Sequence, residues 1–123
     1  MRLLALLPIF LGIAGSLGNA NGATPSKSDL IGNWEEDPGT CEGDNGISYR
    51  SNGSFSGYDY EGRWKLTGET LTTFITKQMD PDDEKWRRVK TPEQEVSTIV
   101  SLTRERLIER WVDGSLHHFH RCR

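Results

Sequence analysis

The sequence predicts an all-β domain, a small antiparallel up-and-down barrel of about seven or eight strands. Along residues 29–123, short runs rich in β-branched and aromatic residues alternate with turn-forming residues. Two hairpin signals, Asn52-Gly53 and Asp113-Gly114, lie near the two ends of this region. Closure of such a series of hairpins into a barrel leaves no exposed strand edge.

Five runs in the first half of the domain are predicted strands, because each is short and bounded by turn formers. Asn52-Gly53 connects the second run to the third, and both residues accept the positive backbone angles of a tight hairpin. In the fourth run Trp64 and Leu66 share one face, as alternation along a strand requires. The five runs are residues 30–35, 46–51, 54–58, 62–66 and 70–76.

A charged segment at residues 79–95 interrupts the strand pattern. Within it, Asp80 suits a helix cap and Pro81 suits a first helical turn, and acidic residues precede basic ones. We expect a loop here, with a helical turn in residues 80–88.

Residues 96–112 fit two patterns. Their apolar residues match a helical stripe, but the β-branched run at residues 96–100 favours strands. The hairpin signal Asp113-Gly114 also needs a strand on each side, and residues 116–122 supply the second one. We therefore predict two strands joined by a turn at residues 103–105, followed by a closing strand.

The N-terminal segment has the features of a secretory signal peptide. Arg2 precedes an apolar run at residues 3–17, and small residues follow it at Gly18 and Ala20. We expect residues 1–20 to be a signal peptide, with an uncleaved anchor as the alternative. Residues 21–28 would then be a flexible tail and residues 29–123 the barrel domain. The mature protein would be periplasmic or secreted, with no integral membrane span.

Two cysteines, Cys41 and Cys122, are the only ones in the chain. In an oxidising compartment they are expected to form one internal disulfide, although free thiols and an intermolecular bridge are alternatives. The chain has a net charge of −3, which argues against a nucleic-acid partner held through phosphates.

The residues Gly32-Asn33-Trp34 resemble the Gly-x-Trp signature of lipocalins and their relatives, and residues 52–64 resemble short lipocalin-like domains of exported bacterial proteins. The resemblance implies a small barrel in which Trp34 fills the closed end. It also implies that an arginine near the last strand packs across that tryptophan, with Arg121 the first candidate and Arg123 the second.

The resemblance and the aromatic residues together favour a binding protein that captures a small apolar or amphipathic ligand in the barrel mouth. We expect the ligand to contact Tyr49, Phe55, Tyr58 and Trp86, with Tyr60 nearby. The competing function is a protein-interaction module, an inhibitor or envelope accessory factor with a filled barrel. In that case Trp86, in the charged loop, would anchor the partner protein. A monomer without cofactors is expected in both cases.

Trp34, Trp64 and Trp111 fall on predicted strands and are expected to be core residues. His118 and His120 share one strand face and could supply two metal ligands, but a site usually needs three or four. We therefore expect no metal site.

The acidic loops lack the ligand spacing of an EF-hand. Glu35 and Glu109 are an imaginable acid pair, yet no catalytic motif accompanies them. The sequence predicts a protein that is not an enzyme.

Overall fold

The computed structural model describes residues 24–123, so the predicted signal peptide lies outside the described residues. A short helix, α2 (Lys27–Leu30), is followed by nine strands. Residues 27 and 28, assigned above to the tail, begin this helix, and Ser26 caps it. The strands are β1 (Gly32–Glu36), β2 (Ile47–Tyr49), β3 (Ser54–Ser56), β4 (Tyr60–Thr67), β5 (Thr70–Met79), β6 (Trp86–Arg88), β7 (Gln94–Leu102), β8 (Arg106–Trp111) and β9 (Leu116–Cys122).

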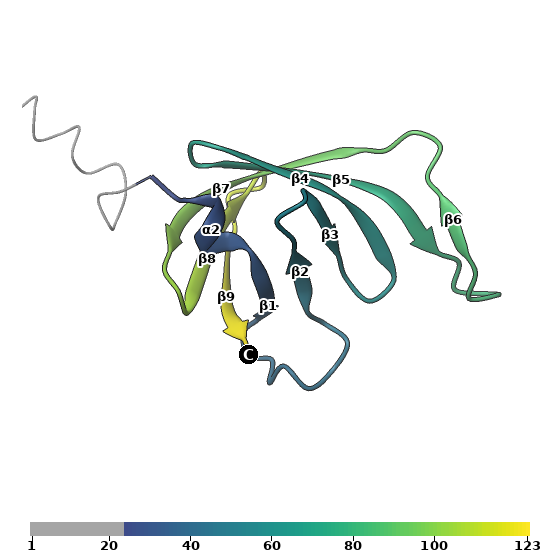
Figure 1. Cartoon of the computed structure of the whole chain (residues 1–123), viewed down its shortest axis with the longest axis horizontal. Helices are drawn as coiled ribbons and strands as arrows, with labels where there is room; N and C mark the ends of the chain where they lie inside the picture. Colours follow the sequence, from purple (N-terminus) through teal and green to yellow (C-terminus); the bar gives the residue numbers. More distant parts are fainter. Residues whose placement is uncertain (1–23) are drawn as a thin grey trace, which may run out of the picture.

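Eight of the strands form a closed antiparallel barrel, as predicted (Figure 1). Successive strands pair with one another, and the pairing of β1 with β9 joins the two ends of the meander. The exception is β6, which pairs with the far end of β5. Strand β4 pairs with β5 along one edge. On the other edge, β7 pairs with the first half of β5, and β6 pairs with the last residues that β7 leaves free.

The strand prediction for residues 96–112 is confirmed, since β7 and β8 cover it. The prediction for residues 80–88 was incomplete. The segment does turn after Asp80, but it ends in strand β6. All three residues of β6 are exposed and two are arginines, so it shows none of the apolar alternation by which a strand is recognised. No helix among residues 24–123 is long and apolar enough to span a membrane.

One end of the barrel is closed by α2 and by Trp34, which is fully buried. The indole Nε1 of Trp34 donates a hydrogen bond to the carbonyl oxygen of Leu30 at 2.8 Å. The Arg121 guanidinium lies over the indole, 4.4 Å from the ring centroid. Arg121 also donates hydrogen bonds to the carbonyls of Ile31 and Asp29, just before β1. Arg123 lies elsewhere and pairs with the carboxylate of Glu105.

The closed end explains why a glycine precedes this tryptophan by two residues. Gly32 has a φ of +141°, a backbone conformation that residues with a side chain rarely adopt. A Cβ atom at this position would lie 2.2 Å from Nη1 of Arg121. The space that a side chain would fill at residue 32 is therefore occupied by the arginine.

The predicted disulfide between Cys41 and Cys122 is confirmed, with the two Cα atoms 5.6 Å apart. It ties the loop after β1 to the end of β9, on the outside of the barrel. Glu35, on the outer face of β1, is buried beneath this loop and accepts a hydrogen bond from the backbone N–H of Cys41. The bridge therefore reinforces the same pair of strands that Trp34 and Arg121 hold together inside the barrel.

We expect Gly32→Ala to lower the free energy of unfolding by about 3 kcal/mol, because it adds backbone strain and displaces Arg121. The matched control is Gly43→Ala, where an added Cβ meets no atom within 4 Å. Urea unfolding of both variants measures the difference. Equal midpoints for the two variants would contradict the account of the closed end.

Removing the disulfide with Cys41→Ala and Cys122→Ala together should cost about 4 kcal/mol, because the bridge closes a loop with a sequence separation of 81 residues. Thermal unfolding with and without dithiothreitol measures the effect. The reductant should lower the melting temperature of the parent protein and leave that of the double variant unchanged. A parent protein insensitive to reductant after full reduction would show that the bridge contributes no stability.

Candidate functional site

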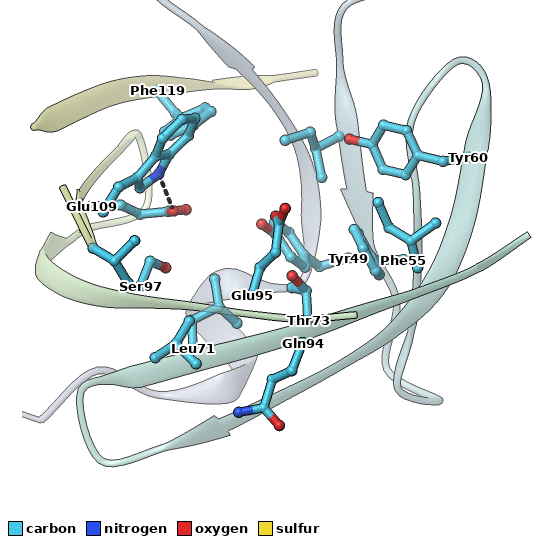
Figure 2. A pocket seen from close by; sticks show the side chains of 15 residues that line it. Tyr49, Phe55, Tyr60, Leu71, Thr73, Gln94, Glu95, Ser97, Glu109 and Phe119 are labelled. Carbon is cyan, nitrogen blue, oxygen red and sulfur yellow. Dashed lines mark hydrogen bonds between the residues drawn. The ribbon is translucent and has the colours of Figure 1, made fainter. Parts of the chain in front are cut away.

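The half of the barrel away from α2 contains a cavity of about 530 Å³ (Figure 2). Val112, which contributes to its lining, is 89% exposed, so the cavity reaches solvent at the end of β8. The cavity is lined by Ile47, Tyr49, Phe55, Tyr60, Leu71, Thr73, Ile75, Gln94, Glu95, Val96, Ser97, Glu109, Trp111, Val112 and Phe119.

Aromatic rings from β2, β3 and β4 form one wall of the cavity. The rings of Tyr49 and Phe55 are stacked with centroids 6.0 Å apart, and Phe55 meets Tyr60 at 5.7 Å. Behind them, Trp64 packs edge-on against Tyr49. Gly62 leaves room for this wall, because a Cβ there would lie 2.7 Å from the Phe55 ring. The wall is therefore fixed by packing before any ligand arrives.

The opposite wall, from β7 and β8, is acidic. Glu109 is only 5% exposed, and its carboxylate accepts a hydrogen bond from the indole Nε1 of Trp111 at 3.2 Å, drawn dashed in Figure 2. Burial raises the pKa of Glu109, and hydrogen bonds from Trp111 and Ser97 only partly oppose this. Glu95 stands on the same face of β7 as Ser97 and extends toward Tyr49. Two carboxyl groups thus face the aromatic wall.

Burial and the nearby acids both raise the pKa values of the two tyrosines of the cavity. Burial raises the pKa of Tyr49 well above its usual value, and the charge of Glu109 raises it further. Burial also raises the pKa of Tyr60, with smaller contributions from Asp59 and Glu95. Both phenols therefore keep their protons at neutral pH and can act as hydrogen-bond donors.

The rim of the cavity carries His117, which faces inward from β9. Its Nδ1 lies 2.7 Å from a carboxylate oxygen of Glu36, and its Nε2 lies 2.8 Å from the hydroxyl of Ser115. The imidazole also stacks on the indole of Trp111, with centroids 3.4 Å apart. These contacts hold Trp111 at the rim, 41% exposed. The expectation that Trp111 is a core residue was wrong, because β8 ends at the barrel mouth rather than in the packed half.

Of the four residues expected to contact a ligand, two line the cavity and two do not. Tyr49 and Phe55 line the cavity together with Tyr60. Tyr58, 62% exposed, lies between β3 and β4, and Trp86, 42% exposed, lies on β6; neither contributes to the lining. Glu109 was not expected in the lining, although it lies two residues after the buried Leu107 and therefore shares the inner face of β8 with it.

His118 and His120, the two histidines that share a strand face, lie on the outer face of β9. His120 Nδ1 is 2.6 Å from Asp37, and His120 Nε2 is 3.4 Å from the sulfur of Cys41. The hydrogen bond with His120 is the main cause that lowers the pKa of Asp37. Within residues 24–123, the one group of three or more close metal-type ligands is Glu35, Cys41, His120 and Cys122. Its two sulfurs form the disulfide, so one carboxylate and one imidazole remain as metal donors.

The two buried acids do not form a pair. Glu35 is opposite His120 in the register of β1 and β9, on the outer face, whereas Glu109 lines the cavity inside the barrel. The barrel wall separates the two carboxylates, so they cannot act on one bond from two sides.

No family model, curated protein or solved structure matched this chain when it was compared with known proteins. The class of protein is therefore defined by the fold and the cavity together. It is a small closed β-barrel, sealed at one end and hollow at the other, with an aromatic wall facing an acidic one.

Glu109→Gln should stabilise the protein at pH 7.5. A raised pKa means that the folded protein holds the Glu109 proton more tightly than the unfolded chain does. Below the unfolded pKa the two states are protonated alike, and stability is then lost as the pH rises through the folded pKa. The variant avoids this loss and keeps an acceptor for Trp111.

Urea unfolding at pH 4.0 and pH 7.5 measures this effect. The advantage of Glu109→Gln over the parent protein should be present at pH 7.5 and shrink toward pH 4.0. Glu61→Gln, at an exposed position on β4, is the matched control and should show no such trend. A constant difference at both pH values would show that ionisation of Glu109 costs the fold nothing.

Proposed function

We propose that this protein is an exported, lipocalin-like binding protein that captures a small apolar or amphipathic ligand in the barrel mouth. The observation that carries the proposal is the cavity of about 530 Å³, which is lined on one side by the aromatic wall of Tyr49, Phe55 and Tyr60. Small-molecule sites have volumes of roughly 300–1,000 Å³ and combine an apolar lining with few polar groups. The cavity has both properties.

The lipocalin-like part of the proposal is supported by the closed end. Gly32, Trp34 and Arg121 stand in the arrangement that the resemblance implies, with the guanidinium over the indole. Export is supported by the signal-like sequence of residues 1–20 and by the disulfide, which persists in oxidising compartments.

The competing function is a protein-interaction module. It is favoured by Trp86, an exposed indole on β6 outside the cavity. Exposed tryptophans often anchor protein partners. The two functions depend on different residues, so substitutions separate them.

The neutral dye N-phenyl-1-naphthylamine should bind the parent protein with a rise in dye fluorescence. Thr73→Trp, which fills the cavity from β5, should weaken binding at least tenfold. Trp86→Ala is the control outside the cavity and should bind as the parent does. Circular dichroism checks that each variant is folded. A dye that binds Thr73→Trp normally and fails to bind Trp86→Ala would place the binding surface at β6.

A further inference from the structure

We propose that the ligand of this cavity is an organic cation, with a flat apolar body and a protonated amine or amidine group held by Glu109. This inference rests on the proposed function and narrows its ligand class. It follows from the charge of the cavity, from the partners of Glu109 and from the arrangement of the two walls.

Glu109 is a buried carboxyl group whose hydrogen-bond partners are neutral, while His117, its neighbour across β9, acts on it through charge alone. Its hydrogen bonds come from the indole of Trp111 and the hydroxyl of Ser97. Among the ion pairs of the described residues, none involves Glu109. A buried carboxylate without a cation is costly, and the cost falls when an opposite charge enters the same site. A ligand ammonium group would supply that charge.

The other charges around the cavity point the same way. Neither lysine nor arginine is among its lining residues, whereas Glu95 and Glu109 both are. His117 is the basic group at the rim, and it already contacts the carboxylate of Glu36. An anionic ligand would meet the buried carboxyl group of Glu109 and the exposed one of Glu95, with no lysine or arginine among the lining residues. A cation finds a complementary field.

The two walls also suit an amphipathic cation. Figure 2 shows Tyr49, Phe55 and Tyr60 on one side of the cavity and Glu109 with Ser97 on the other. A flat apolar body packs against the rings while its charged group reaches β8, and ring faces attract cations as well. A bare metal ion fits less well, since the group of close metal-type ligands within residues 24–123 lies outside the barrel.

The test uses three probes with one ring system and different head groups: 2-(2-naphthyl)ethylamine, 2-(2-naphthyl)ethanol and 2-naphthylacetic acid. Isothermal titration of the parent protein at pH 7.5 should show the amine binding at least tenfold more tightly than the alcohol, and the acid most weakly. Glu109→Gln should abolish the preference for the amine and leave the affinity for the alcohol within about twofold. Glu61→Gln should keep the order of the parent protein.

The outcomes separate this inference from the proposed function. If the amine and the alcohol bind the parent protein equally, the cation preference is wrong while the binding function stands. If the acid binds most tightly, the charge argument is wrong. If all three probes and the neutral dye fail to bind, the proposed function fails as well. The comparison on the parent protein decides the inference even where Glu109→Gln does not fold.

Discussion

Closure of the barrel depends on Arg121. Its guanidinium lies over the indole of Trp34 and donates hydrogen bonds to the carbonyls of Asp29, Ile31 and Arg104. One side chain on the last strand thereby holds the segment before β1 and the turn between β7 and β8. Residue 32 is a glycine because the Arg121 side chain occupies the space that a Cβ atom would need. The disulfide at the neighbouring residue of β9 adds a covalent tie on the outer side of the same wall.

The barrel interior is divided between the packed closed end and the cavity. The closed end is packed with apolar side chains, including Trp34, Leu102 and Leu107, all of them buried. The open end keeps a cavity and buries Glu109, a group that burial disfavours in its charged form. A protein selected for stability alone would gain by filling this space and replacing the acid. The proposed capture of a ligand would account for both the cavity and the acid.

Strand alternation predicts much of this fold, and its exceptions have physical causes. Strand β4 buries every second residue from Gly62 to Leu66 and can be recognised in the sequence. Strand β6 cannot, because its residues are all exposed and it forms only by pairing with β5. The inward orientation of Glu109 can also be inferred from the sequence, because Glu109 lies two residues after the apolar Leu107. Whether the interior is filled or hollow cannot be inferred from the sequence. It depends on the volumes of side chains on opposite walls, which only the closed barrel brings together.

A β-bulge interrupts the strand alternation within residues 96–112. Ile99 pairs with Glu109 and Leu102 with Leu107, and the register shifts between Ile99 and Ser101. In a regular strand Ile99 and Leu102, three residues apart, would face opposite sides, but the bulge turns both inward. A spacing of three between buried residues is also typical of a helix.

The same bulge determines which side chains of β7 line the cavity. Because it lies between the two halves of β7, Leu102 packs into the closed end while Ser97 and Glu95 still face the interior. Without the extra residue, an inward Leu102 would turn Ser97 and Glu95 to the outer face. A second irregularity, between Glu61 and Gly62 of β4, lies at the level of the aromatic wall. Bulges of this kind re-aim side chains next to functional sites. Here they allow one barrel to combine a packed half with a hollow half in which Ser97, Glu95 and Glu109 join a mainly apolar lining.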